Sequence, residues 1–190
     1  MSLIDQSKPL KLGMVGLSAT GWAATVLGPT VTQPSMREHF DLVAVSTSNE
    51  TSAKASAEKH AKVVGHPVKA YYGDTSRISG DSDVDHVAVA VKAIYHKASV
   101  MPAIEAGKSI FVEWPAGTGL QDSVDMAEAA RKYGVRSIVG LQGRQSKVFA
   151  KVRYDFHISL THTNPYIPQA KELIESGKIG TIRSTIIVSH

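Results

Sequence analysis

The chain has 190 residues, and with 43% hydrophobic and 20% charged residues it has the composition of a folded globular protein, which excludes wholesale disorder. Its net charge of +4 is spread along the sequence without a basic run, so a nucleic-acid surface is not indicated. The absence of cysteine excludes a disulfide scaffold, a thiolate zinc site and a thiol nucleophile.

The chain contains no apolar stretch of roughly 18 residues, the length that a membrane-spanning helix needs. Residues 1–11 lack the apolar core of a secretory signal peptide. We therefore expect a soluble protein of the cytoplasm, or alternatively of the nucleus, with no membrane partner and no direct contact with nucleic acid.

Six short apolar runs predict strands. They are rich in Val and Ile and nearly continuous rather than alternating, which is typical of strands that are covered on both faces. The runs are 11–16, 42–46, 69–72, 86–91, 109–113 and 135–141.

Three segments between these runs predict helices, namely 51–62, 95–106 and 120–133. The first is rich in Ala, Lys and Glu, and the second repeats apolar residues at helical spacing. Strands that alternate with helices in this way indicate βαβ units. The expected fold class is therefore α/β, a doubly wound parallel sheet with helices on both faces.

The first predicted strand runs into the turn 16–21 (GLSATG), which is followed by Trp22. The turn has the Gly-x-Gly-x-x-Gly pattern with Ser18 at the middle position. In such a turn Gly16 makes the tight bend, the middle position lets the backbone approach a pyrophosphate, and Gly21 lets the next helix pack with its N-terminus facing the anion. We infer a Rossmann-type dinucleotide site at Gly16, Ser18, Gly21 and Trp22. The alternative is a turn that serves helix packing alone.

The second predicted strand ends in Ser46, Thr47, Ser48 and Asn49, with no acid before Glu50. Sites for NAD usually place a carboxylate here, where it accepts from the ribose 2′-hydroxyl. Without it a 2′-phosphate meets no repulsion and the hydroxyls can donate to it, which favours NADP over NAD. No arginine follows to clamp the phosphate, so NAD stays open. The alternative role of this turn is to cap the next helix.

Three further motifs carry a resemblance to a known family: 91–96 (VKAIYH), 105–108 (EAGK) and 113–115 (EWP). With the glycine turn they resemble the N-terminal half of the Gfo/Idh/MocA oxidoreductases. In that family the fourth strand ends in Thr-Pro-Asn-x-x-His, the next helix in Glu-Ala-Gly-Lys and the fifth strand in Glu-Lys-Pro. The departures at 21–23, 113–115 and 140–146 are similar to a fungal branch around the galactose-regulon repressor.

The resemblance implies cofactor contacts by Val91, Lys92, His96, Glu113 and Arg144. Glu113 would contact the nicotinamide ribose, and His96 would contact a ribose or cap a helix. Arg144, past the sixth strand, would face the cofactor crevice or form a surface ion pair.

Trp114 stands where the family has a lysine that handles a proton near the nicotinamide. An indole can neither pass that proton nor neutralise an alkoxide, so Trp114 would stack on the nicotinamide, close the pocket or lie in the core. Lys92 is a candidate for the missing ammonium, with a solvated lysine as the alternative, and we assign no catalytic residue. The Trp114–Pro115 bond is a candidate for the cis form.

The regular pattern stops near residue 146. The stretch 147–164 has neither a helical nor a strand period, whereas 165–176 again predicts a helix and 181–189 a strand. We expect a dinucleotide-binding Rossmann domain over 1–146, a foreign insertion or loop over 147–164, and the linking helix and first strand of a truncated second α+β domain over 165–190. His157 and His162 are too isolated to predict a metal site.

The resemblance implies that the full-length relative transfers a hydride between NAD(P) and a sugar or polyol. The alternative is a non-catalytic transcriptional regulator that senses the dinucleotide, as in galactose regulation. A protein partner, or a second copy of the chain, would then bind through the missing second domain. Sequence alone leaves open whether this chain is an enzyme.

Overall fold

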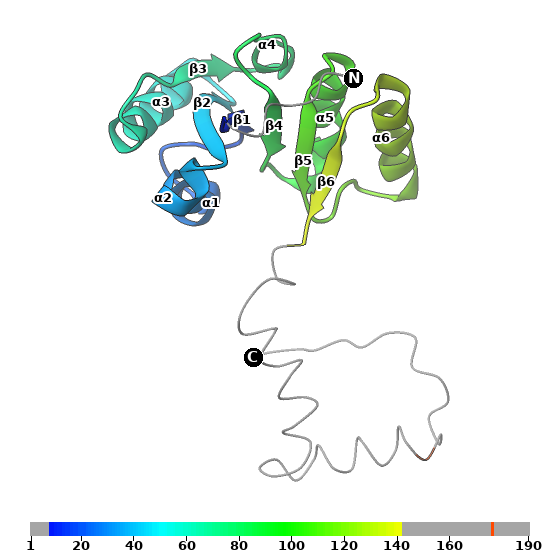
Figure 1. Cartoon of the computed structure of the whole chain (residues 1–190). Coiled ribbons are helices and arrows are strands. Elements are labelled where there is room, and N and C mark those ends of the chain that lie inside the picture. Colours follow the sequence, from blue (N-terminus) through cyan, green and yellow to red (C-terminus); the bar gives the residue numbers. More distant parts are fainter. Residues whose placement is uncertain (1–7, 142–175, 177–190) are drawn as a thin grey trace. The chain divides into compact units, whose positions relative to one another are not determined.

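The computed structural model describes residues 8–141 and Ser176 (Figure 1). The predicted contact Arg144, the predicted insertion 147–164 and, apart from Ser176, the predicted linking segment 165–190 lie outside these residues. The domain bounds inferred from the sequence therefore stay a prediction.

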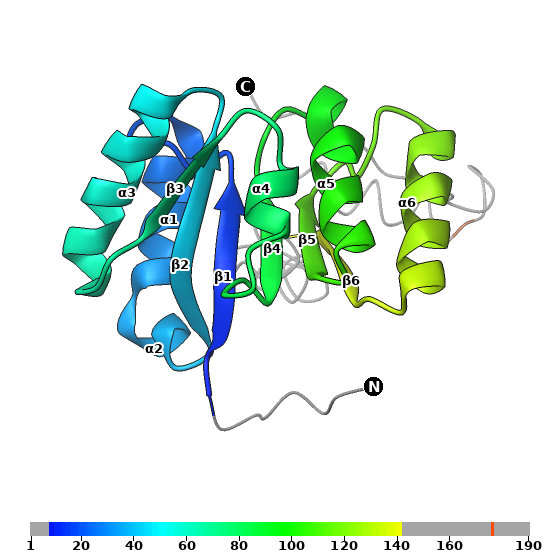
Figure 2. The same cartoon turned by 90° about the horizontal axis from the view of Figure 1, so that it is seen from above.

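Six parallel strands form one sheet in the order β3-β2-β1-β4-β5-β6, and Figure 2 shows them side by side. Every predicted strand is present, and the bounds are β1 Leu10–Val15, β2 Phe40–Thr47, β3 Lys69–Tyr72, β4 His86–Val89, β5 Ser109–Glu113 and β6 Ser137–Gly140. Because β1 pairs with β2 on one side and with β4 on the other, the chain changes direction across the sheet at β1. The crevice that binds ligands in such sheets lies at this point, outside the carboxyl ends of the strands.

The helices include three that the sequence predicts, and these correspond to α3, α5 and α6. The bounds are α1 Trp22–Thr32, α2 Pro34–Arg37, α3 Glu50–Val64, α4 Ser76–Ser79, a 3₁₀ turn Ala93–Tyr95, α5 His96–Glu105 and α6 Leu120–Tyr133. The helical pattern of α1 is hidden because Gly28 and Pro29 interrupt a run of β-branched residues. The helices α2 and α4 are single turns, too short to show a period.

Helices cover both faces of the sheet, which confirms the doubly wound α/β fold. Successive strand residues point to opposite faces: Met14 and Val45 belong to one buried cluster with Ala23 of α1, and Val15 belongs to the other with Val100 of α5. Figure 1 shows α1 and α4 on opposite sides of β1 and β2. Burial on both faces explains why the strands read as continuous apolar runs.

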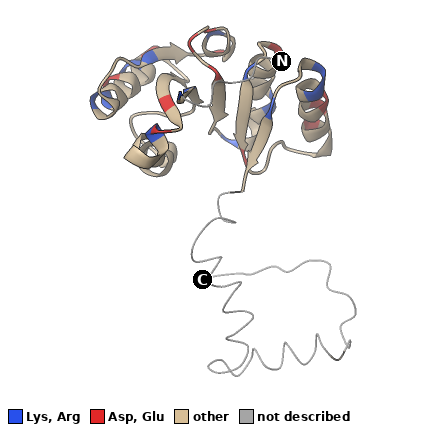
Figure 3. Cartoon of the chain, in the orientation of Figure 1, with Lys and Arg blue, Asp and Glu red and all other residues tan. Residues whose placement is uncertain are grey.

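Charges of both signs are interspersed on the helix surfaces, as Figure 3 shows on α3 and α6. The described surface therefore carries ordinary solvated charge of both signs.

An ionic network joins the amino ends of β1 and β3 to the segment that precedes β4. The Lys69 ammonium lies 2.9 Å from Asp81 and 2.7 Å from Asp83, Lys11 lies 3.2 Å from Asp83, and the Tyr71 hydroxyl donates to Asp81 at 2.9 Å. The Asp81 side chain is only 7% exposed. Burial alone would raise the pKa of Asp81, but hydrogen bonds from the Asp83 N–H, Lys69 and Tyr71 outweigh it and hold that pKa below its ordinary value.

We expect Asp81→Asn to lower the free energy of unfolding at pH 7 by about 2 kcal/mol, because a buried hydrogen-bonded charge is lost. The pKa of Asp81 is lower in the folded chain than its ordinary value of 3.8, so the stabilisation by its carboxylate is present above pH 3.8 and is lost as the pH falls through the folded value. The difference between variant and parent should therefore shrink in acid.

Urea unfolding followed by circular dichroism measures this difference across pH. The control is Glu58→Gln, which neutralises an exposed carboxylate on α3. A gap between Asp81→Asn and the parent that stays constant in acid would contradict the prediction.

Candidate functional site

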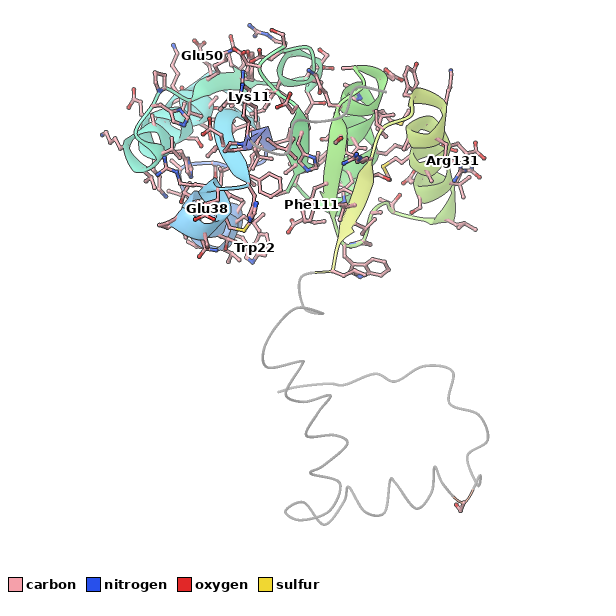
Figure 4. All side chains as sticks on the ribbon, in the orientation of Figure 1. Lys11, Trp22, Glu38, Glu50, Phe111 and Arg131 are labelled. Carbon is pink, nitrogen blue, oxygen red and sulfur yellow. The ribbon has the colours of Figure 1, made fainter. Side chains whose placement is uncertain are left out.

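A pocket of about 790 Å³ opens at the carboxyl ends of β1, β2, β4 and β5. Ten of the residues predicted from the sequence line it: Gly16, Ser18, Gly21, Trp22, Ser46, Thr47, Ser48, Val91, Lys92 and Glu113. Trp22, labelled in Figure 4 at the start of α1, is 55% exposed at the rim. Asn49, His96 and Trp114 do not line the pocket, and their positions are described below.

Gly16 makes the tight bend between β1 and the glycine turn. Its φ of +91° is a conformation that side chains disfavour, and an added Cβ would overlap the Ala90 carbonyl oxygen and lie 2.8 Å from the Ala90 carbonyl carbon. The Gly16 N–H donates to the Ser46 carbonyl at 2.8 Å. The bend therefore packs against the carboxyl ends of both neighbouring strands, and only glycine fits there.

The turn leads into the N-terminus of α1, where Gly21 is the N-cap without a side-chain hydrogen bond. The first N–H groups of a helix have no partner within the helix, so they are available to an anion in the pocket. The Ser18 hydroxyl at the middle position donates to the Thr20 carbonyl within the turn. The turn thus presents backbone donors where a pyrophosphate would bind.

Two side chains of α3 hold the glycine turn from behind. The buried Ser56 hydroxyl donates to the Leu17 carbonyl at 2.6 Å, and the Lys59 ammonium donates to the Ala19 carbonyl at 2.8 Å. Below them His60 bonds through Nδ1 to the Ser56 carbonyl at 2.8 Å, and burial lowers the pKa of His60. Sequence reasoning missed these contacts because they join residues about 40 positions apart and follow no motif.

The serine-rich turn after β2 has two roles. The Asn49 side chain accepts from the Ser52 N–H at 2.9 Å and so caps α3, which is the alternative stated for this turn. Ser46 and Thr47 are buried, whereas Ser48 is exposed and lines the pocket. Capping by Asn49 leaves the Ser48 hydroxyl on the pocket wall.

The charges around this end of the pocket come from α3 and from the segment that follows β3, and of these only Asp74 lines the pocket. The Lys54 ammonium pairs with Glu50 at 2.7 Å, and the Arg77 guanidinium lies 5.4 Å from the centre of the Tyr72 ring. Asp74 lines the pocket, and its hydrogen bonds from the hydroxyl and the N–H of Ser76 lower its pKa. Sequence reasoning did not predict these charges, because tertiary packing and not the Gly-x-Gly-x-x-Gly pattern brings Lys54, Arg77 and Asp74 together.

The other end of the pocket is built by the turns after β4 and β5. Val91, Lys92 and Tyr95 line it from one turn and Glu113 from the other. Trp114 is 69% exposed, so it is not a core residue, and the Trp114–Pro115 bond is cis.

His96 lies beneath these two turns. It is 1% exposed, its Nδ1 is 2.8 Å from the Pro115 carbonyl oxygen and its Nε2 is 2.9 Å from the Val91 carbonyl oxygen. Both ring nitrogens are therefore engaged by the protein backbone. The N-cap of α5 is Tyr95, so His96 does not occupy the capping position.

Within residues 8–141 no cluster of His, Asp or Glu could hold a metal ion. The same part of the chain contains no helix long and apolar enough to cross a membrane. The histidines at 157 and 162 lie outside the described residues.

Residues 10–141 match the profile of the family described as "Oxidoreductase family, NAD-binding Rossmann fold" (GFO_IDH_MocA). The chain belongs to this family. Dehydrogenase aclE of Aspergillus oryzae is 34% identical over 94% of the chain, and the galactose/lactose metabolism regulatory protein GAL80 of Saccharomyces cerevisiae is 31% identical over 100% of it. The chain spans about two fifths of these relatives, 43% of the first and 40% of the second.

Solved structures agree with this assignment. A super-repressor mutant of Gal80p from S. cerevisiae superposes with a TM-score of 0.63 and 29% identity, over 93% of this chain and 41% of that one. An NAD-binding oxidoreductase from Klebsiella pneumoniae gives a TM-score of 0.55 and 27% identity, over 90% of this chain and 40% of that one. The family and its NAD(P)-binding Rossmann fold therefore agree with the resemblance inferred from the motifs.

We expect Gly16→Ala to lower the free energy of unfolding by about 3 kcal/mol, because it combines an unfavourable φ with a clash against the Ala90 backbone. Gly65→Ala is the matched control: its φ is +83°, but nothing lies within 4 Å of the added Cβ. The control should cost only about 1 kcal/mol. Urea unfolding of both variants measures the difference, and equal losses would show that the close approach at Gly16 carries no cost.

Proposed function

We propose that the pocket binds a nicotinamide dinucleotide and prefers NADP(H). The observation that carries the proposal is the glycine turn at the switch point of the sheet, whose residues Gly16, Ser18 and Gly21 line the pocket at the N-terminus of α1. The pyrophosphate would lie at Gly16–Gly21, the adenosine ribose beside Ser46, Thr47 and Ser48, and the nicotinamide toward Val91 and Glu113. The strand order supports this orientation of the dinucleotide, because β2 and β4 flank β1 on opposite sides.

The preference for the 2′-phosphate rests on the charges around Ser48. No carboxylate at the end of β2 lines the pocket, and the hydroxyls of Ser48 and Ser52 do. Outside the pocket lining, Arg77 at the start of α4 adds a cation, whereas the Lys54 ammonium on α3 is neutralised by Glu50. Asp74 is the opposing charge, and the Ser76 N–H holds its carboxylate at 2.5 Å.

Calorimetric titration with NAD, NADH, NADP and NADPH tests the proposal. We expect Ser48→Asp to weaken NADP binding about tenfold or more and to spare NAD, because a carboxylate repels the 2′-phosphate and accepts from a 2′-hydroxyl. Ser35→Asp, an exposed serine on α2, is the control for added charge. Tighter binding of NAD than NADP by the parent chain would overturn the preference, and no binding of any of the four would overturn the site.

For the full-length protein we propose hydride transfer with a sugar or polyol. The dinucleotide supplies the hydride acceptor at nicotinamide C4. Val91 and Glu113, at the ends of β4 and β5, would hold the nicotinamide. The Lys92 ammonium would take over the role of the family's lysine, which Trp114 replaces. The 34% identity to a dehydrogenase supports this function.

The second candidate is a regulator that uses the bound dinucleotide to change its association with a protein. The observation that favours it is Trp114, a neutral and 69% exposed side chain in place of a proton-handling lysine. The 31% identity to a galactose/lactose regulatory protein supports it further.

A polyol-oxidation assay on the full-length gene product separates the two functions. If the protein is an oxidoreductase, we expect Lys92→Met to lower kcat by about a hundredfold, the usual loss for a proton-transfer group. Lys132→Met, on the exposed face of α6, should leave kcat unchanged. No turnover by a parent protein that binds NADP would decide for the regulator.

A further inference from the structure

The His96 ring joins the two turns that form the β4–β5 end of the pocket. Its Nε2 meets the carbonyl oxygen of Val91, which follows β4, and its Nδ1 meets the carbonyl oxygen of Pro115, which follows β5. The residue is 1% exposed.

Both partners of the ring are carbonyl oxygens, and a carbonyl oxygen accepts but never donates. A neutral imidazole has one N–H and one lone pair, so either tautomer would set a lone pair against a carbonyl oxygen at under 3 Å. The imidazolium form donates from both nitrogens and satisfies both carbonyls. The geometry therefore selects the doubly protonated ring.

Two effects oppose this charge. The ring stands at the N-terminus of α5, whose dipole disfavours a cation, and its burial removes water. Against these stand two charge-assisted hydrogen bonds, each stronger than a single helix-dipole interaction. The charged groups on the joined turns are Lys92 and Glu113.

The charged residue next to His96 on α5, Lys97, is paired with carboxylates of α6. The Lys97 ammonium lies 2.5 Å from Asp125 and 3.4 Å from Asp122, both on α6. Among the described residues, Glu113 is the carboxylate nearest in sequence to Pro115. The joined turns also carry Val91 and Lys92 on the pocket wall.

We propose that His96, as an imidazolium, is a positioning residue that fixes the β4 and β5 turns and thereby the nicotinamide end of the pocket. It acts without touching the cofactor, through Val91 and Glu113. The inference rests on the proposed dinucleotide function, but its central claim concerns the ring itself. The clamp can therefore be tested with and without a ligand.

Nuclear magnetic resonance of the ligand-free chain tests the protonation state. With isotopically labelled histidine ring nitrogens, the His96 ring is assigned by its contacts with Val91 and Pro115. We expect two protonated nitrogens with similar shifts at neutral pH. One protonated and one bare nitrogen would overturn the proposal, and this measurement needs no variant that folds.

Calorimetric titration of His96→Gln tests the positioning role. A glutamine amide cannot donate to carbonyls on both sides of the ring position, so we expect NADP binding to weaken about tenfold or more. Adenosine 2′,5′-bisphosphate, which lacks the nicotinamide half, should bind the variant and the parent equally. A variant that only lost stability would bind both ligands more weakly.

His86→Gln is the matched control, because His86 lies at the amino end of β4, against Phe40 and away from the pocket. It should bind both ligands as the parent does. Unchanged NADP binding by His96→Gln, or equal losses for both ligands, would overturn the positioning role. If the parent binds no dinucleotide, the proposed function fails while the resonance result still decides the state of the ring.

Discussion

The close approach of the Gly16 bend to the Ala90 carbonyl is the constraint on which the pocket depends. It brings the end of β1 against the end of β4, and the Gly16 N–H reaches Ser46 at the end of β2. Three strand ends are thereby joined at one point of the sheet edge. The glycine turn starts from this point, so its residues line the crevice at the N-terminus of α1.

The walls of the pocket are held by side chains that never enter it. Ser56 and Lys59 of α3 fix the carbonyls of the glycine turn, and His96 fixes the turns after β4 and β5. Preorganised backbone of this kind spares a ligand the entropy of ordering the site. Binding and positioning are thus divided between residues on the pocket surface and residues behind it.

The sequence predicts the strands and the glycine turn well because each leaves a local pattern. Buried parallel strands read as Val and Ile runs, and Gly16 lies where only glycine fits. The role of His96 could not be predicted, because its partner Pro115 lies 19 residues away and is brought near by the pairing of β4 with β5. Helix α1 could not be predicted because Gly28 and Pro29 weaken its local sequence signal, although packing in the folded chain sustains the helix.

The ionic network around Asp81 lies at the amino ends of the strands, and the pocket lies at their carboxyl ends. Substitutions at distant sites with no shared partners add nearly independently. The two edges of one sheet can therefore diverge separately among descendants of this chain. A gain in stability at the amino edge can therefore offset a destabilising change at the pocket edge without touching the residues that line the pocket.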